Sequence, residues 1–274
     1  MYIYIYIYIS VPSEHLKAIQ KWIVKNILDE QMYSDFAHAY TKSRSIFTNA
    51  ELHIGNRILL KMDIHNFFDS ISFEMVKEIF ISLNYNNQVA SDLARLCTYH
   101  GYVRQGFVSS PIISNIILAS FDNALNELLL SKKYIKYNLK YTRYSDDITI
   151  SSASEEIVEM KDIIDEVSSL LEENGFEVNQ SKTKIIKGTN PKVVTGVIVK
   201  SNSISIPRKF KKELLKELHF CERFGVQSHL IYTGKFGKLN YKEHLEGIAN
   251  FIRNTDSKFY EQVIERIRKL DIDA

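Results

Sequence analysis

Near its middle the chain contains the run Tyr141-Thr142-Arg143-Tyr144-Ser145-Asp146-Asp147-Ile148-Thr149-Ile150-Ser151. The residues on either side of the two aspartates favour β-strands, and Ser145-Asp146 suits a tight turn between them. Adjacent carboxylates repel each other, so folding gains nothing from placing them on one rigid hairpin. A divalent cation such as Mg²⁺, which prefers oxygen ligands, would remove that repulsion. Aspartate is also common in ordinary turns, and an isolated pair is more often only a solvated hairpin tip.

Composition places the chain among globular proteins and says little about a partner. Its 274 residues, 45% hydrophobic and 25% charged, suffice for one large domain or two lobes, and the formal net charge is +2. The two cysteines, Cys97 and Cys221, are isolated in the sequence, which argues against a disulfide framework and favours a reducing cytoplasm. No apolar run is long enough to span a membrane.

Hydrophobic periodicity predicts a mixed α/β part followed by a helical part. The alternation of Tyr and Ile over Met1–Ile9 predicts a strand, and Val193–Val199 with Ser203–Pro207 predicts one hairpin. The pattern changes to helices after residue 207, so we expect a domain boundary after residue 205. An early helix is expected to bury one stripe, formed by Leu16, Ile19, Trp22, Ile23 and Ile27.

A third acid, Asp63, ends a predicted strand at Leu59–Asp63. A carboxylate at the end of a buried strand is costly unless a partner or a metal ion compensates it, although an ordinary turn aspartate explains it equally well. Distant strands can lie side by side in an antiparallel sheet, so Asp63 could meet Asp146 and Asp147. Carboxylates that hold two metal ions about 3.5–4 Å apart suit phosphoryl transfer, because the ions neutralise the attacking and leaving oxygens.

Four blocks, in a fixed order, resemble those of reverse transcriptases. They are Leu60–Ile71, which contains Asp63; Arg104–Asn115; Tyr144–Asp147; and Gly175–Thr183. Any one of them is a weak signal, but four in order are a strong one.

Two further blocks, Asn49–His53 and Val194–Gly196, are similar to those that mark retron reverse transcriptases. The resemblance implies an α+β fold, a right-hand polymerase in which an antiparallel sheet is backed by helices. Fingers and palm would occupy residues 1–205, and a helical thumb would occupy residues 206–274.

The resemblance also implies the catalytic chemistry. Asp63, Asp146 and Asp147 would bind two Mg²⁺ ions and catalyse nucleotidyl transfer from dNTPs. Phe68 would face the sugar of the incoming nucleotide and exclude a 2′-hydroxyl by its bulk, although a core phenylalanine is the competing explanation.

Four more residues would contact the nucleotide. Gln105 and Gly106 would shape its pocket, and Arg44 would contact phosphate or template. Lys182 would approach the leaving pyrophosphate, where an ammonium group offsets charge or donates a proton, although a solvated loop lysine is nearly as good an explanation.

RNA contacts are implied for two groups of residues. The retron-like blocks supply Asn49, His53, Val194, Thr195 and Gly196, and the basic run after residue 207 supplies Arg208, Lys209 and Lys212. A plain turn at Thr195-Gly196 and a solvated amphipathic helix face are the simpler alternatives.

Members of the family bind a cognate non-coding RNA, begin synthesis from the 2′-hydroxyl of a guanosine in it, and make a single-stranded DNA that stays joined to the RNA. The resemblance therefore implies a bacterial cytoplasmic enzyme that works with an effector protein in anti-phage defence. An RNA-templated RNA polymerase and a catalytically weak RNA-binding scaffold are the alternatives. One departure favours the scaffold: the chain begins too late for an upstream hairpin, and no arginine precedes Pro12. Triphosphate binding would then be weakened, unless another residue such as Arg44 or Lys42 substitutes.

Overall fold

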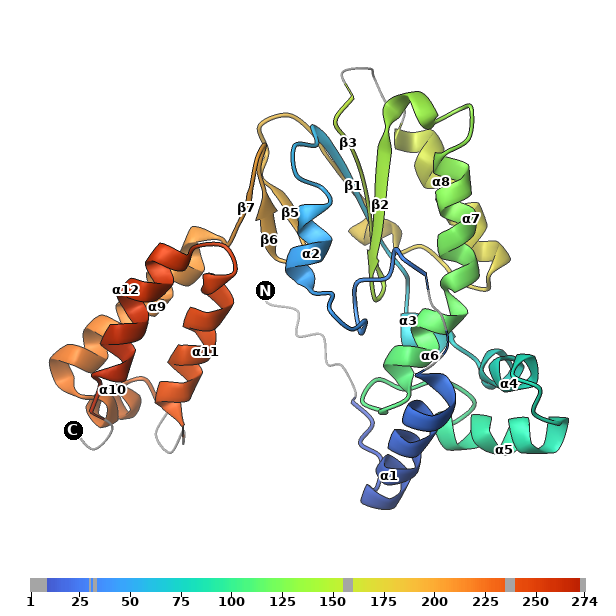
Figure 1. Cartoon of the computed structure of the whole chain (residues 1–274), viewed down its shortest axis with the longest axis horizontal. Coiled ribbons are helices and arrows are strands. Elements are labelled where there is room, and N and C mark those ends of the chain that lie inside the picture. The colour runs from blue at the N-terminus through green and yellow to red at the C-terminus, as the bar shows by residue number, and fades with distance from the viewer. Residues whose placement is uncertain (1–8, 30, 32–33, 155–159, 235–239, 272–274) are drawn as a thin grey trace. The chain divides into compact units, whose positions relative to one another are not determined.

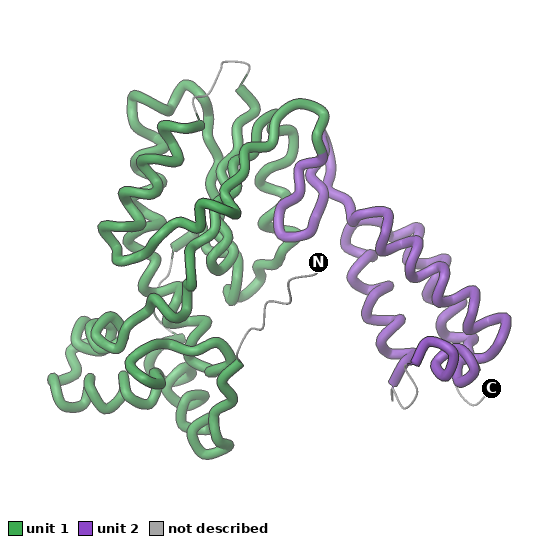
Figure 2. The backbone as a smooth tube through the Cα atoms, turned by 180° about the vertical axis from the view of Figure 1, so that it is seen from behind, with its two compact units in different colours: residues 1–190 green, residues 191–274 purple. Residues whose placement is uncertain are grey.

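The computed structural model describes residues 9–29, 31, 34–154, 160–234 and 240–271. The chain divides into two compact units, Met1–Asn190 and Pro191–Ala274 (Figure 2). The units divide at residue 190, earlier in the chain than the boundary expected after residue 205, because three short strands group with the C-terminal helices. The strand predicted at Met1–Ile9 falls almost entirely outside the described residues. In the described ranges, no helix is long and apolar enough to cross a bilayer.

One antiparallel sheet of the first unit brings distant acids together. Its strand order is β2-β3-β1-β4. Figure 1 labels β1, β2 and β3 of this sheet. β2 (Leu139–Tyr144) and β3 (Asp147–Ser152) form the predicted hairpin, and β1 (Ile58–Asp63) pairs with the other edge of β3. The short strand β4 (Lys184–Ile186) pairs with β1.

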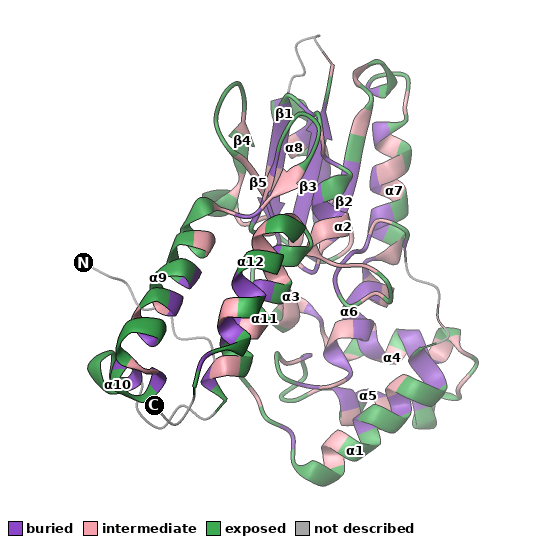
Figure 3. Cartoon of the chain, turned by 60° about the vertical axis from the view of Figure 1, so that its left-hand side comes forward, coloured by how far each residue is buried: buried purple, intermediate pink, exposed green. Residues whose placement is uncertain are grey.

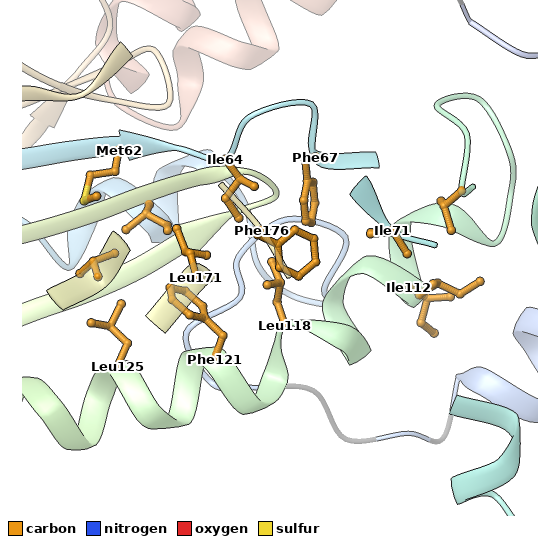
Figure 4. Packing of buried hydrophobic residues seen from close by; sticks show 14 of the residues in the cluster. Met62, Ile64, Phe67, Ile71, Ile112, Leu118, Phe121, Leu125, Leu171 and Phe176 are labelled. Atoms are coloured by element: carbon orange, nitrogen blue, oxygen red, sulfur yellow. The ribbon is translucent and has the colours of Figure 1, made fainter. Parts of the chain in front are cut away.

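The helix-facing side of this sheet is apolar, because side chains alternate between the faces of a strand. Leu60 lies opposite Ile150 and Met62 opposite Ile148, and all four belong to the hydrophobic core. They pack with residues from α7 (Ala119–Leu129) and α8 (Met160–Glu173), among them Phe121, Leu125 and Leu171 (Figure 4).

The remaining helices of the first unit carry local start signals. Ser13 caps α1 by accepting a hydrogen bond from the Leu16 N–H at 3.3 Å, and Pro111 lies in the first turn of α6. The predicted buried stripe of α1 is partly wrong, since Ile19 is 42% and Trp22 59% exposed. These helices are α1 (Glu14–Ile23), continued by a π-helical segment Val24–Leu28, α2 (Ile46–Glu51), α3 (Phe67–Ser70), α4 (Phe73–Ser82), α5 (Asn87–Cys97) and α6 (Ser110–Ile117), with 3₁₀ turns at Ile135–Tyr137 and Gln180–Lys182.

The other face of the sheet is partly polar and is held by a buried histidine. His53 follows α2, and its Nδ1 lies 2.6 Å from Ser151 Oγ and its Nε2 2.8 Å from Thr142 Oγ1. Burial, aided by the charges of His38 and Lys140, lowers the pKa of His53 from 6.5 to about 3. The ring therefore joins the two strands of the hairpin in its neutral form.

The second unit combines a small sheet with helices. β5 (Lys192–Val194), β6 (Val197–Val199) and β7 (Ile204–Ser205) form it in that order, so the predicted single hairpin is in fact three strands. Apolar residues such as Leu214, Leu218, Leu245, Ile252 and Ile267 are buried among the helices. These are α9 (Arg208–Phe224), α10 (Val226–Tyr232), α11 (Tyr241–Arg253) and α12 (Ser257–Arg268). Antiparallel sheets backed by helices, followed by a helical part, confirm the predicted α+β class.

Acid should destabilise the protein partly through His53. Below the unfolded-state pKa of 6.5 the unfolded chain binds a proton that the folded ring takes up only near pH 3, so the free energy of unfolding falls as pH falls through this window. One such group contributes up to about 1.4 kcal/mol per pH unit. We expect urea unfolding between about pH 6 and about pH 4 to show a shallower pH dependence for His53→Gln than for the wild type. Equal slopes would contradict a neutral, buried His53.

Candidate active site

The Asp146-Asp147 turn joins β2 to β3 as predicted. Tyr144, the last residue of β2, pairs with Asp147, the first residue of β3. Ser145 has a φ of +60°, a left-handed conformation that tight turns require but that serine adopts at a cost. The two aspartates are half-buried at the tip of this hairpin.

Asp63 meets both of them. Its Cα lies directly opposite that of Asp147 in the β1–β3 ladder, and the Ile64 N–H donates to the Asp146 carbonyl at 3.1 Å. All three carboxylates line one cavity of about 710 Å³. The described residues around it are Ser10, Tyr40, Asp63, Ile64, Asn66, Phe67, Phe68, Asp69, Arg104, Gln105, Tyr144, Ser145, Asp146, Asp147, Asn179 and Lys182.

The electrostatics of the cavity reflect crowded negative charge. Burial raises the pKa of Asp146, and the charges of Asp63 and Asp147 raise it further. Burial and the Asp63 charge likewise raise the pKa of Asp147, while Lys61 and Lys182 oppose that rise. Removing either carboxylate from water and placing it beside another disfavours its ionised form.

Asp63 has its own partners from the segment before β4. Lys182 Nζ lies 2.9 Å from its carboxylate, and Asn179 Nδ2 donates to Oδ1 at 3.2 Å. The Asn179 N–H also donates to the Asp63 carbonyl at 2.7 Å. The hydrogen bond to Asp63 raises the pKa of Lys182, whose side chain remains 59% exposed.

These residues suit a divalent cation by donor chemistry. Carboxylate oxygens are the ligands that hard cations prefer, and three of them face one cavity in which their charges are incompletely compensated. Within the described ranges, no three His, Cys, Asp or Glu side chains already lie in an arrangement that would hold a metal ion. Asp63 is instead paired with the Lys182 ammonium, which supplies positive charge at that position.

The structure brings three of the predicted nucleotide contacts to the acids. Phe68, Gln105 and Lys182 all line the cavity. Phe68 also packs against Phe67, with ring centroids 5.3 Å apart, so it has one side in the core and another towards the cavity.

Gly106 is not among the described lining residues, and its environment gives it a different role. Its φ is +105°, and a Cβ there would lie 2.5 Å from the Ser10 carbonyl oxygen. The Ser10 N–H donates to the Gln105 carbonyl at 2.9 Å. Glycine is therefore required here because the chain near Ser10 passes directly over it.

Arg44 is not among the described residues that line the cavity, and its expected contact with phosphate or template stays a prediction. Its guanidinium donates to the Asp35 and Ala37 carbonyls and lies 3.2 Å from the Asp35 carboxylate. It thus holds the loop before α2. Lys42, the other candidate, pairs with Asp29 at 2.8 Å.

Three of the predicted RNA contacts are buried. Asn49 is 1%, His53 0% and Val194 0% exposed, so their side chains do not reach a surface at which RNA could bind. His53 joins the hairpin strands instead. Thr195 and Gly196, with φ of +45° and +83°, form the two-residue turn between β5 and β6. Such a plain turn is the simpler alternative to the RNA contact predicted for Thr195-Gly196.

The basic residues of α9 are exposed, as an RNA contact requires. Arg208, Lys209 and Lys212 are exposed and line one shallow pocket with Glu213 and Lys216. Figure 3 shows that much of the surface of α9 is exposed. Lys209 also pairs with Glu213 at 3.7 Å, so part of the positive charge is compensated locally.

Some lining residues were missed by sequence reasoning. Tyr40, Asn66, Asp69, Arg104 and Asn179 were given no role. Asn66, Asp69, Arg104 and Asn179 lie inside the quoted blocks, which was the available signal for them. Tyr40 lies in a loop without periodicity, and nothing local indicates that its hydroxyl lies 3.4 Å from Ser145 Oγ.

Comparison with known proteins places this chain in a family. The family described as reverse transcriptase (RNA-dependent DNA polymerase) matches residues 6–211. Retron Ec86 reverse transcriptase of Escherichia coli is 33% identical over 261 residues, covering 95% of this chain and 75% of that protein. Retron Mx65 reverse transcriptase of Myxococcus xanthus is 28% identical over 274 residues, covering 93% of this chain and 60% of that protein.

Among solved structures, telomerase from Candida albicans with a fragment of telomeric RNA gives a TM-score of 0.49 at 14% identity, covering 94% of this chain and 58% of that one. The chain spans about three fifths of the length of the retron Mx65 enzyme and of this telomerase chain. The family match extends over most of the chain, and the retron Ec86 enzyme is similar along nearly all of it. The chain therefore belongs to the retron-type reverse transcriptases, a group of RNA-directed DNA polymerases.

Proposed function

We propose that this chain copies part of a cognate structured non-coding RNA into single-stranded DNA, starting from the 2′-hydroxyl of a guanosine in that RNA. The DNA product then stays joined to the RNA, and the complex acts with an effector protein in bacterial anti-phage defence. The observation that carries the catalytic part is the register that sets Asp63 opposite Asp147 beside Asp146. The similarity to retron reverse transcriptases supports a structured non-coding RNA as the template.

Asp63, Asp146 and Asp147 would hold two Mg²⁺ ions, which supply charge neutralisation for the attacking hydroxyl and the leaving pyrophosphate. The chain's own residues orient the substrate. Phe68 limits the space beside the sugar, and Gln105 lines the cavity from the segment that precedes α6. Lys182 swings between Asp63 and the leaving group, as its exposed side chain permits.

The second unit supplies the remaining contacts in this proposal. Residues 206–274 act as the thumb, and the exposed Arg208, Lys209 and Lys212 follow a phosphate backbone. The Thr195-Gly196 turn is exposed enough for its backbone to approach RNA closely.

Removing the paired acids should separate catalysis from binding. The purified protein, given the non-coding RNA transcribed beside its gene, dNTPs and Mg²⁺, should make DNA, and Asp146→Ala/Asp147→Ala should make none. RNA affinity and folding should be retained, since the exchange relieves repulsion between buried charges. DNA made by the double variant would show that the site is elsewhere. A wild type that binds the RNA without making DNA would favour the scaffold alternative.

Phe68→Ala should weaken sugar discrimination. We expect the ratio of kcat/KM for dNTP to that for rNTP to fall by about tenfold or more, because the space beside C2′ opens. Phe176→Leu is the matched control: its buried ring packs against Phe67, with centroids 5.8 Å apart, and does not line the cavity, so it should lower stability while leaving the ratio unchanged. An unchanged ratio in Phe68→Ala would assign Phe68 to the core alone.

Lys182→Met should strengthen divalent-cation binding while slowing synthesis. The ammonium competes with a cation for the Asp63 carboxylate, so its removal should raise Mn²⁺ affinity several-fold in titrations without nucleotide. Lys184→Met removes the same charge from an exposed position that does not line the cavity, and it should have little effect. If both variants changed the affinity equally, net charge rather than the ion pair would be responsible.

A further inference from the structure

Beneath the Asp146-Asp147 turn lies a buried ion pair that the catalytic chemistry does not use. Arg143 of β2 and Asp122 of α7 are both fully buried. The guanidinium binds the carboxylate through two nitrogens, Nε to Oδ1 at 2.8 Å and Nη2 to Oδ2 at 2.7 Å. This parallel two-bond geometry fixes the plane of the guanidinium group.

The third nitrogen of Arg143 reaches the turn itself. Nη1 donates to the Ser145 carbonyl oxygen and to Asn115 Oδ1, each at 3.1 Å. Ser145 is the residue in the left-handed conformation, and it directly precedes the two acids. On the other side of the turn, the Ile64 N–H holds the Asp146 carbonyl. The turn is therefore fixed both by the residue that follows β1 and by the buried guanidinium.

The ion pair is anchored independently of that contact. The Tyr141 hydroxyl donates to Asp122 Oδ1 and the Ser34 hydroxyl to Oδ2, each at 2.5 Å. Asn115 Nδ2 donates to the Ala39 carbonyl at 2.8 Å, which holds the side chain that receives Nη1. The network thus links the turn to α6, α7 and the loop before α2.

Stability alone does not account for this arrangement. The desolvation of two buried charges offsets much of their attraction, and apolar residues of similar volume often serve a core equally well. A guanidinium, unlike an apolar side chain, has a donor left for the Ser145 carbonyl after both oxygens of Asp122 are bound. The strand's alternation also requires a side chain at this position to point away from the face that carries Asp147.

We propose that Arg143 is a positioning residue for the catalytic turn. By holding the Ser145 carbonyl it keeps the carboxylates of Asp146 and Asp147 directed towards Asp63, so that the three acids can share cations. This inference rests on the proposed function for its kinetic consequence, but its effect on cation binding can be measured without any synthesis.

Arg143→Lys tests the proposal, because an ammonium can pair with Asp122 but cannot also hold Ser145 in the same geometry. We expect kcat to fall about tenfold to a hundredfold, since small misplacements of reacting groups cost that much. The KM for dNTP should change little, because Arg143 does not line the cavity. Mn²⁺ affinity without nucleotide should fall several-fold. A folded Arg143→Lys protein with wild-type kcat and Mn²⁺ affinity would overturn the proposal.

Tyr141→Phe is the matched control for a merely structural role. It removes a hydrogen bond from the same Asp122 carboxylate but leaves the Arg143–Ser145 contact in place. It should lower the unfolding temperature yet retain kcat and Mn²⁺ affinity wherever it is folded. If a folded Tyr141→Phe protein lost both kcat and Mn²⁺ affinity as Arg143→Lys does, the network would serve only to stabilise the core.

Asn115→Ala tests the positioning role of Arg143 if the Arg143→Lys protein does not fold. It keeps the ion pair with Asp122 and removes the other acceptor of Nη1, so the donor to Ser145 is less firmly held. We expect a smaller fall in kcat with weaker Mn²⁺ binding, and no change in either would overturn the proposal. Should the wild type make no DNA at all, the proposed function fails, and the Mn²⁺ titrations still test the positioning role.

Discussion

The register between β1 and β3 is the constraint on which the site depends. Side chains repeat every two residues along a strand, so a slip of one residue would turn Asp147 from the cavity to the helix-facing side. The apolar pairs Leu60–Ile150 and Met62–Ile148 prevent such a slip, because it would expose them and bury polar residues in the core. Hydrophobic burial on one face of the sheet therefore forces like charges together on the other.

That arrangement is unfavourable by itself, and the surrounding residues limit its cost. Burial raises the pKa values of Asp146 and Asp147, and the charges of the neighbouring carboxylates raise them further. Lys182 and Asn179 compensate Asp63, and they come from a segment that returns to the edge of β1 just before β4. Since the Lys182 side chain is largely exposed, this compensation can be exchanged for a cation, which a fully buried ion pair would not allow.

The sequence was most informative where a pattern is local. Alternation and turn residues predicted β1 and the β2–β3 hairpin, and the ordered blocks placed Phe68, Gln105 and Lys182 with the acids. It was least informative where a polar side chain has a distant partner. His53 binds hydroxyls of Ser151 and Thr142, about ninety residues later in the chain, so a buried structural histidine looked like an exposed contact. Likewise, residue type does not reveal that the guanidinium of Arg44 already binds the Ala37 carbonyl and lies beside the Asp35 carboxylate.

The order of residues in the hairpin follows from the pleat of its strands. Tyr141 and Arg143 lie on the helix-facing side with Ile150 and Ile148, where Asp122 can receive them. Tyr144, one residue on, faces the cavity instead. The reversal at Ser145 then returns the chain so that Asp147 lies on the cavity side of β3. The buried Arg143, the left-handed turn at Ser145 and the two aspartates must therefore follow one another at this spacing. Arg143 therefore acts together with the two aspartates, because it holds the backbone carbonyl of the residue directly before them.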